Sequence, residues 1–378
     1  MSMRNLHWGA LTAGTAIMLA LLLVLDRVDG LKKPVLVENR MLAERPAWPA
    51  DLPDLGRFRS AVDAYANDQF PSRAYLIGGL NYLRFLAGYS GSSKVVVGHQ
   101  GWLFYDDGSH LSQLRPSTLD AVWARSWVAE LASRRAELEK RGAHYFVVAA
   151  PVKETIYPDF VPRSFRPDRP APGDAGVLQA AVTAAAVPGF IDLHAGLDAA
   201  RGAGVAVYSP FDTHWTGEGA YVGYVALMNA MARQGVPVVP QSRGHFFAPA
   251  PGVLPPQDLA RMLGIGGLAR QHYPRLTSDA AAHVRVRYLG NGTDLTADRV
   301  IETGAKGPVL QLTGDSFTVA LLPLLYGSFS RIVVSHYQNG FHRPDLIDQF
   351  HPDVVLLEVI ESGIRHAMTP PPAPNPAK

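Results

Sequence analysis

The sequence of 378 residues contains no cysteine, which excludes disulfide bonds, thiol chemistry and cysteine-ligated metals. It also lacks an excess of either charge: 35 Lys and Arg residues stand against 33 Asp and Glu residues, so nothing favours nucleic acid as a partner. The 13 histidines include no His-x-x-x-His pair of the kind that forms a zinc site on a helix. We therefore expect neither a metal nor another cofactor, and no nucleic-acid partner.

What the chain does contain is typical of a folded protein. Hydrophobic residues make up 47% and charged residues 18%, a balance that differs from that of disordered chains. The length permits a sizeable core and at most two or three domains. No internal repeat is present.

The longest uncharged run extends from Trp8 to Leu25 and is just long enough to cross a bilayer. Charged and bulky residues follow it instead of a small-x-small cleavage site, which favours an uncleaved signal anchor over residues 1–30. The positive-inside rule alone would place the N-terminus outside, because Arg27, Lys32 and Lys33 outnumber Arg4. We nevertheless expect the body to be exported, because a single terminal anchor ahead of a large domain usually has that orientation.

Composition divides the remainder into three parts. Residues 31–57 are rich in proline and charge and are expected to form a linker, and residues 366–378 a disordered, proline-rich tail. Residues 58–365 are expected to form the folded domain. Within it, the spacing of apolar residues predicts two helices over 58–87, interrupted at Pro71, and one helix over 119–141 that stops at Gly142.

Strands and helices then alternate along the domain. Two short apolar runs at 94–98 and 101–105 indicate a hairpin. Runs that are apolar on both faces indicate a mainly parallel sheet covered by helices on both sides, an α/β three-layer sandwich. The expected strands are 144–150, 190–193, 205–208, 308–312, 331–335 and 353–359. Residues 237–256 and 264–279 are expected to form long loops or a short helical insertion.

The stretch Gly314-Asp315-Ser316 follows one of these strands and precedes an apolar helical pattern from Val319 to Leu325. A serine on such a turn has its hydroxyl at the carboxyl end of the sheet and its backbone N–H at a helix N-terminus, where negative charge is favoured. That position suits the nucleophile of an acyl-transfer reaction. Gly, Asp and Ser are also ordinary turn residues, so the tripeptide alone leaves both interpretations open.

A second stretch, Asp212-Thr213-His214-Trp215, precedes a helix for which Thr216 is a suitable N-cap. An Asp that accepts a hydrogen bond from a His ring fixes the tautomer, so that the other ring nitrogen can take a proton from a serine. A capped, hydrogen-bonded turn is the alternative interpretation. Together, however, Asp212, His214 and Ser316 form the combination expected of a Ser-His-Asp triad on an α/β sheet.

At this point the chain resembles the SGNH-type O-acetyltransferases of bacterial exopolysaccharide modification, the alginate O-acetyltransferase AlgJ/AlgX family. The resemblance covers roughly residues 60–362, and the order Asp, His, Ser is that of the family. The matching segments are 67–73 (NDQFPSR), 95–105 (VVVGHQGWLFY), 151–158 (PVKETIYP), 212–215 (DTHW), 314–317 (GDSF) and 352–358 (PDVVLLE). No carbohydrate-binding module follows the domain, so the anchored AlgJ-like branch is the nearer match.

The resemblance implies specific roles and partners. It implies Ser316 as nucleophile, His214 as general base and then acid, and Asp212 as the residue that orients His214. It also implies a periplasmic protein tethered to the inner membrane, a polysaccharide acceptor and a membrane-bound acyltransferase that supplies the acetyl donor. Asp315 is then expected to brace the turn instead of serving the triad.

Other residues are candidates for binding the oxyanion or the substrate. The Ser316 N–H is one expected oxyanion donor, and the side chain of Asn339, in the loop that also holds Tyr337, is a candidate for the second. Arg343 is suited to pairing with an acidic sugar, and Lys153 follows a strand end near the same edge. The alternative is an ordinary turn for the loop with Asn339, solvation for Arg343 and structural hydrogen bonding for Lys153. The aromatic residues Trp102, Phe104 and Trp215 are expected in the core, with sugar stacking as the alternative.

Three functions are compatible with the sequence. The resemblance favours an O-acetyltransferase that modifies hydroxyls of an exported polysaccharide, alginate-like or otherwise. A secreted SGNH-type carbohydrate or lipid esterase would use the same triad, with water as the acceptor. A non-catalytic polysaccharide-binding scaffold is the third possibility.

Overall fold

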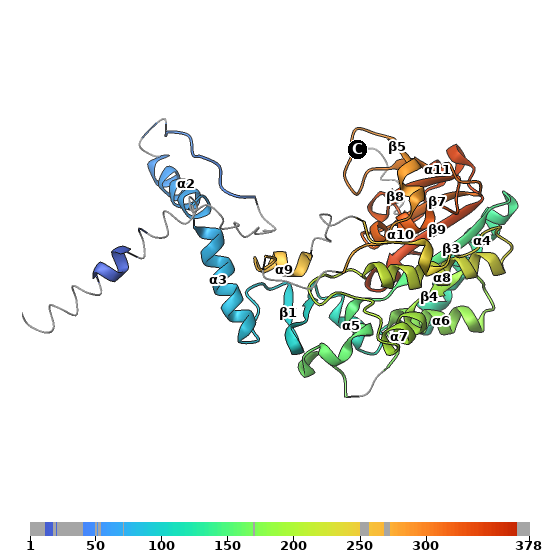
Figure 1. Cartoon of the computed structure of the whole chain (residues 1–378), viewed down its shortest axis with the longest axis horizontal. Helices are drawn as coiled ribbons and strands as arrows, with labels where there is room; N and C mark the ends of the chain where they lie inside the picture. Colours follow the sequence, from blue (N-terminus) through green and yellow to red (C-terminus); the bar gives the residue numbers. More distant parts are fainter. Residues whose placement is uncertain are drawn as a thin grey trace, which may run out of the picture. The chain divides into compact units, whose positions relative to one another are not determined.

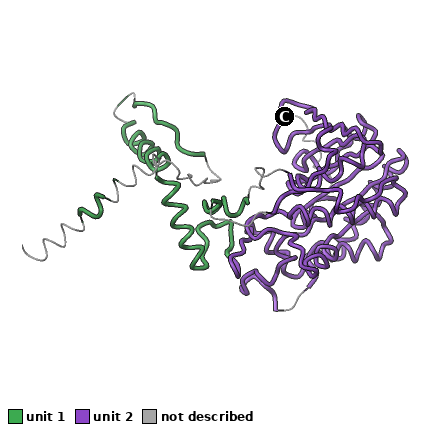
Figure 2. The backbone as a smooth tube through the Cα atoms, viewed as in Figure 1, with its two compact units in different colours: residues 1–97, 257–270 green, residues 98–256, 271–378 purple. Residues whose placement is uncertain are grey.

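The computed structural model describes residues 12–17, 20, 41–49, 51, 54–70, 72–168, 171–249, 257–267 and 273–368. It divides into two compact units, coloured separately in Figure 2. Unit 1 comprises residues 1–97 and 257–270, and unit 2 comprises residues 98–256 and 271–378. Most of the predicted anchor and the proline-rich tail lie outside the described residues, and none of the helices that are described has the length and apolarity needed to cross a membrane.

In unit 1 the two helices predicted before residue 87 are present. They are α2 (Leu55–Asp68) and α3 (Arg73–Leu86), and they are separated near Pro71 as the sequence indicated. The short strand β1 (Val95–Val97) follows, and α9 (Asp258–Met262) belongs to the same unit. The buried amide of Asn81 on α3 donates a hydrogen bond of 2.9 Å to the carbonyl of Leu263, which fixes the end of α9 against α3.

Unit 2 is built around a seven-stranded mixed sheet in the order β4-β3-β9-β7-β8-β6-β5 (Figure 1). The strands are β3 (His144–Ala150), β4 (Phe190–Asp192), β5 (Arg285–Tyr288), β6 (Arg299–Glu302), β7 (Val309–Gly314), β8 (Arg331–His336) and β9 (Val354–Ile360). The pairs β3/β4, β3/β9, β7/β9 and β7/β8 are parallel, whereas β6 is antiparallel to both β8 and β5. The carboxyl ends of the parallel strands therefore meet at one edge, where ligand sites of such sheets are found.

Helices cover both faces of this sheet, so the predicted three-layer sandwich is confirmed. Alternate residues of the central strands, such as Phe146 and Val148, pack against α7 (His194–Gly202), α8 (Gly217–Arg233) and α10 (Thr318–Leu325). The intervening residues, such as Tyr145 and Val147, pack against α4 (Ala121–Lys140), α6 (Asp174–Ala184) and α11 (Pro344–Phe350). Because both faces are buried, the strands read as continuous apolar runs.

Several predicted boundaries are confirmed by local contacts. The helix predicted over 119–141 is α4, whose N-cap Asp120 accepts a 2.7 Å hydrogen bond from the Trp123 N–H. It ends before Gly142, where a φ of 77° requires the left-handed conformation that glycine adopts without strain. The strand β2 (Leu103–Tyr105) and the short helix α5 (Lys153–Ile156) complete the elements near the site. The stretch 237–249 contains one short 3-10 turn, Arg243–His245, and a second such turn begins at Asp279, the last residue of the stretch 273–279, consistent with long loops.

Two predictions about the sheet are wrong. Residues 205–208 do not form a strand, because their backbone groups are bound by other partners: the Val207 carbonyl accepts from the Thr216 N–H and the Ala206 carbonyl from the Thr216 hydroxyl. The antiparallel strands β5 and β6 were not predicted, since their alternating polar residues lack the apolar runs of the parallel strands.

Candidate active site

The turn after β7 brings Ser316 to the carboxyl edge of the sheet. Gly314 allows this turn because of close packing: a Cβ at this residue would lie 2.0 Å from Thr318 Oγ1 and 2.9 Å from Glu358 Oε2. The Asp315 carboxylate accepts a 2.8 Å hydrogen bond from the Phe317 N–H and another of 2.8 Å from the Ile360 N–H at the end of β9. Asp315 thus braces the turn, as expected from the sequence.

A second buried carboxyl supports the same turn. Glu358 on β9 accepts hydrogen bonds from the Thr318 hydroxyl at 2.7 Å and from the Asp315 N–H at 3.3 Å. Burial, and then the neighbouring Asp315 carboxylate, raise the pKa of Glu358 well above its ordinary value. Burial therefore favours the protonated, neutral form of Glu358. The sequence showed this residue only as an acidic interruption of an apolar run.

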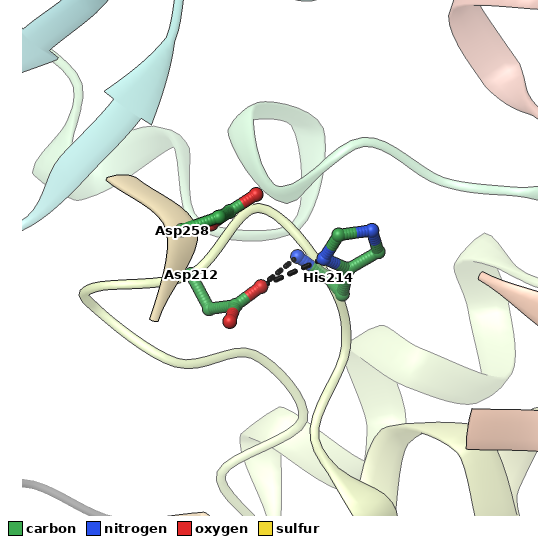
Figure 3. Close-up of side chains that lie close together, drawn as sticks. All are labelled: Asp212, His214 and Asp258. Atoms are coloured by element: carbon green, nitrogen blue, oxygen red, sulfur yellow. Dashed lines mark hydrogen bonds and ion pairs between the residues drawn. The ribbon is translucent and has the colours of Figure 1, made fainter. Parts of the chain in front are cut away.

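The loop before α8 carries Asp212 and His214. Thr216 caps α8 by accepting a 3.0 Å hydrogen bond from the Gly219 N–H, and Tyr208 and Trp215 form an isolated β-bridge that closes the loop. Inside the loop, Asp212 Oδ1 accepts from both the His214 N–H at 3.0 Å and the His214 Nδ1 at 2.7 Å (Figure 3). The imidazole is therefore held in one orientation with its Nδ1 protonated.

The other ring nitrogen faces the serine. His214 Nε2 lies 2.8 Å from Ser316 Oγ, although the two residues are 102 positions apart in the sequence. With the 2.7 Å contact between His214 Nδ1 and Asp212, the three side chains form a continuous hydrogen-bonded chain from carboxylate to hydroxyl. Such an arrangement allows the imidazole to accept the hydroxyl proton while the carboxylate stabilises the resulting imidazolium.

Asp212 is suited to the carboxylate position of this chain. Its side chain is only about 5% exposed. Burial alone would raise the pKa of Asp212, but the hydrogen bond from His214 and the charges of His214 and Lys153 outweigh that effect and hold the pKa below its ordinary value. Asp212 is therefore ionised at neutral pH and can stabilise a positive charge on His214.

Lys153 binds two backbone carbonyl groups of the loop that carries Asp212 and His214. Its side chain is almost completely buried, and Nζ donates to the carbonyls of Ser209 at 3.1 Å and Asp212 at 2.7 Å. Nζ also lies 5.9 Å from the centre of the Trp102 ring and 5.3 Å from that of Phe104. These contacts place Lys153 beside the triad chain, in a position to fix the Asp212 backbone.

Aromatic side chains from the hydrophobic core pack against His214. Phe317 packs against the His214 ring at a centroid distance of 5.1 Å and is almost completely buried. Trp215 packs against Phe317 and donates from Nε1 to the Phe317 carbonyl at 3.1 Å. Trp215 and Phe104 are buried, as expected, while the partly buried Trp102 stacks on Phe160 at 4.5 Å.

The candidates after β8 contact other residues of their surroundings. Asn339 donates from its amide nitrogen to the Thr296 carbonyl at 2.8 Å and to Asp298 at 3.0 Å. Arg343 pairs with Asp345 and Asp298 and donates to the Ser335 hydroxyl at 2.6 Å. Tyr337 stacks on Phe341 at 5.4 Å. These contacts favour a structural function for Asn339 and Arg343.

The Ser316 backbone N–H remains a suitable oxyanion donor. Among the hydrogen bonds of the described residues, none uses this N–H, whereas the Ser316 carbonyl accepts from the Val319 N–H at the start of α10. The N–H therefore lies at a helix N-terminus, where a developing negative charge is stabilised by the helix dipole.

A second Asp-x-His pair, Asp192 and His194, was missed by the sequence analysis although it also follows a strand. Asp192 Oδ1 accepts from the His194 N–H at 3.1 Å and contacts its Nδ1 at 2.5 Å. Here Nε2 contacts the buried Glu361 Oε2 at 3.2 Å and the Thr155 hydroxyl at 3.2 Å. Burial would lower the pKa of His194, but the two carboxylates raise it to about 10. His194 is therefore protonated at neutral pH and cannot accept a proton.

Comparison with known proteins identifies relatives of this fold. Residues 95–349 match the family model described as the SGNH hydrolase-like domain of the acetyltransferase AlgX. A protein named probable alginate O-acetylase AlgJ, from Pseudomonas aeruginosa, is 29% identical over 177 residues, which are 45% of this chain and 42% of the relative. The chain thus spans less than half the length of that relative.

Solved structures show a similar architecture. The structure of Bacillus cereus PatB1 with a sulfonyl adduct is 14% identical and matches 72% of this chain and 96% of its own, with a TM-score of 0.54. The O-acetyltransferase domain of Pseudomonas putida AlgJ is 21% identical and matches 72% of this chain and 92% of its own, with a TM-score of 0.46. The family match confirms the predicted resemblance, and together with the PatB1 structure it confirms the SGNH hydrolase-like α/β fold.

Proposed function

We propose, since the chain belongs to the family of SGNH hydrolase-like domains of the AlgX acetyltransferase type, that it is an O-acetyltransferase. It moves an acetyl group through an acyl-serine intermediate onto hydroxyls of an exported bacterial polysaccharide. The observation that supports this most directly is the contact of Ser316 Oγ with His214 Nε2 at 2.8 Å, with His214 Nδ1 bound to Asp212 at 2.7 Å.

In the first half of the reaction Ser316 Oγ attacks the carbonyl carbon of an acetyl ester or thioester. The hydroxyl proton passes to His214 Nε2, and the bond between the acetyl carbon and the donor breaks. The departing donor takes the proton back from His214. The acetyl group is left on Ser316 as an ester, and Asp212 stabilises the imidazolium while it exists.

In the second half a sugar hydroxyl replaces the donor. Its oxygen attacks the acetyl carbon while its proton passes to His214 Nε2, and the bond between Ser316 Oγ and the acetyl carbon breaks. Ser316 recovers its proton from His214. Each half forms a tetrahedral oxyanion, which the Ser316 N–H at the start of α10 is placed to bind.

The name of a relative supports a proposal for the polymer, to which we add one for the cellular setting. The curated relative is named a probable alginate O-acetylase, which supports an alginate-like or other exopolysaccharide as acceptor. We place the domain in the periplasm, tethered to the inner membrane by residues 1–30 and supplied with acetyl groups by a membrane-bound acyltransferase. Fractionation of cells that express the full chain tests this location: recovery in the cytosolic fraction would contradict it.

The first experiment asks whether Ser316 carries the acetyl group. The protein is incubated with a chromogenic acetyl ester, and intact and peptide mass spectrometry then search for an added acetyl on Ser316. We expect Ser316→Ala to abolish both the adduct and release of the chromophore, and Ser126→Ala on the outer surface of α4 to leave both unchanged. Full turnover by Ser316→Ala, with unchanged circular dichroism, would refute the nucleophile.

The second experiment separates transfer from hydrolysis. The acetyl ester is consumed in the presence and absence of an oligosaccharide acceptor, and the acetylated sugar and free acetate are both quantified. An acetyltransferase yields acetylated sugar at the expense of acetate. Production of acetate alone, with every tested polysaccharide fragment, would contradict the transferase and leave an esterase with the same triad.

A further inference from the structure

A cavity of about 800 Å³ lies in unit 2 apart from the triad, near the ends of β4, β3 and β9. Its volume falls within the range of roughly 300–1,000 Å³ that is typical of small-molecule sites. Asp192 follows from β4, Thr155 lies on α5 after β3, and Glu361 follows β9 directly. The cavity therefore opens at the same carboxyl edge of the sheet as Ser316.

Backbone contacts link the cavity to the serine turn. Ile360 immediately precedes Glu361 and donates its N–H to the Asp315 carboxylate at 2.8 Å, while Asp315 immediately precedes Ser316. The two sites are thus neighbours along one edge, on either side of the end of β9.

Side-chain oxygens of Gln113 and Glu361 at the cavity can accept hydrogen bonds from a ligand. Gln113 is only 7% exposed, and within the described chain its Oε1 has no hydrogen-bond partner. A Cβ built on Gly173 would lie 3.7 Å from this Oε1 and 3.1 Å from Glu361 Oε1, so the two oxygens face the same small space. A buried acceptor without a donor is costly, and a ligand hydroxyl would satisfy it.

Contacts with His194 and its neighbours hold one carboxylate oxygen of Glu361 and leave the other oxygen facing the cavity. Glu361 Oε2 accepts from the Val152 N–H at 3.2 Å and the Thr155 hydroxyl at 3.0 Å, and it contacts His194 Nε2 at 3.2 Å. The other carboxylate oxygen, Oε1, is the one that faces Gln113. The carboxylate is thereby held in a fixed orientation towards the cavity.

The walls supply two further kinds of contact. Leu114 and three prolines, Pro158, Pro167 and Pro172, present apolar surface, which suits the C–H faces of a sugar ring. Arg163 and Arg166 supply positive charge to a lining that also contains the carboxyl groups of Asp159, Asp168, Asp192 and Glu361. Among the described residues neither arginine has an ion-pair partner. Arg166 Nε is moreover buried without a hydrogen-bond partner in that part of the chain.

We propose that this cavity is a second saccharide-binding site, which takes a sugar unit that carries a carboxylate. Sugar hydroxyls donate to Gln113 Oε1 and Glu361 Oε1, the ring packs against the prolines, and the carboxylate pairs with Arg163 and Arg166. Arginine is suited to this task because its planar guanidinium binds carboxylates bidentately. The site would hold an acidic polymer beside Ser316 and does not depend on the triad for binding.

The test uses two probes that differ only in charge: the hexamer of galacturonic acid and its fully methyl-esterified form. Binding is measured by isothermal titration calorimetry on the full chain carrying Ser316→Ala, so that no ester is turned over. We expect the acidic hexamer to bind more tightly than the neutral one, and its affinity to fall as sodium chloride is raised.

Three further variants in that background resolve the contacts. Arg163→Gln with Arg166→Gln should weaken the acidic hexamer about tenfold and leave the neutral one unchanged, whereas Gln113→Leu should weaken both. Arg287→Gln is the matched control, because it removes the same charge from the exposed strand β5 at the opposite end of the sheet.

The outcomes also distinguish failure of this binding site from failure of the proposed acetyltransferase activity. The same substitutions are also made in the protein that retains Ser316. These variants should release the chromophore from a small acetyl ester at the wild-type rate, because a small ester does not need the cavity. Binding that is lost equally in the double arginine variant and in Arg287→Gln would refute the site, as would failure of both hexamers to bind. Neither result would alter the test of the acyl-serine.

Discussion

Replacement of Glu358 by glutamine tests the buried acid that supports the turn carrying Ser316. The carboxyl has an ordinary pKa of 4.5, and burial next to Asp315 raises it well above this value in the folded state. Below pH 4.5 this carboxyl is protonated in both the folded and the unfolded state, so its contribution to the free energy of unfolding does not change with pH. Above pH 4.5 the unfolded state loses the proton and the folded state keeps it.

The free energy of unfolding contributed by this group must therefore fall as pH rises, by about 1.4 kcal/mol per pH unit until the folded-state pKa is reached. Glutamine has the shape of the protonated acid and does not titrate. The stability of Glu358→Gln relative to wild type should consequently rise by the same amount per pH unit. Burial also raises the pKa of the neighbouring Asp315, which is present in both proteins.

The assay is urea unfolding followed by circular dichroism at pH 5, 6, 7 and 8, with wild type and variant measured in parallel. Glu137→Gln on the exposed face of α4 is the matched control, and its difference from wild type should show no comparable slope. A difference for Glu358→Gln that stays constant from pH 5 to 8 would refute the reasoning, because it would mean that Glu358 is ionised in the folded protein.

Three further substitutions test the remaining contacts. Asp212→Asn should leave the fold intact and lower turnover of a chromogenic acetyl ester by about 10³- to 10⁴-fold, because the tautomer of His214 is no longer fixed; a loss below tenfold would contradict its orienting function. Lys153→Met should lower the free energy of unfolding by about 3 kcal/mol, since two buried carbonyls lose a charged donor, and unchanged urea stability would show that these bonds are unimportant. Gly314→Ala should cost about 2 kcal/mol in the same assay through its contact with Thr318, whereas Gly327→Ala, whose Cβ meets no atom within 4 Å, should not.

The parallel part of the sheet could be predicted because burial on both faces leaves a direct trace in the sequence. The β9 run from Val354 to Ile360 is an example, since every residue but the last is buried. β5 leaves no such trace: all four of its residues are exposed, and Arg285 and Arg287 alternate with Val286 and Tyr288. Its position is determined by hydrogen bonds to β6, which residue type does not reveal.

The run from Val205 to Tyr208 shows the opposite error. It has the composition of a strand, with Val207 and Tyr208 fully buried. Its polar backbone atoms, however, are satisfied by Tyr157 and Thr216, because the Val207 N–H donates to the Tyr157 hydroxyl at 3.2 Å. Burial and backbone pairing are separate requirements, and apolar composition indicates only the first.

The two Asp-x-His turns show where motif reasoning ends and structure is needed. In both, the Asp Oδ1 binds the His N–H and Nδ1, at 3.0 and 2.7 Å for Asp212 with His214 and at 3.1 and 2.5 Å for Asp192 with His194. The two-residue spacing thus fixes the orientation of the ring in each case, and this much follows from the sequence.

What the ring can do depends on the partner of Nε2, which comes from a distant part of the chain. For His214 that partner is the Ser316 hydroxyl, which can give up a proton to a neutral imidazole. For His194 it is the Glu361 carboxylate, and a second negative charge keeps the imidazole protonated, with a pKa of about 10. The same local motif therefore provides a proton acceptor for Ser316, which follows β7, and a protonated histidine beside Glu361, which follows β9. The choice between them is made by the order of strands in the sheet, which places Ser316 opposite one turn and Glu361 opposite the other.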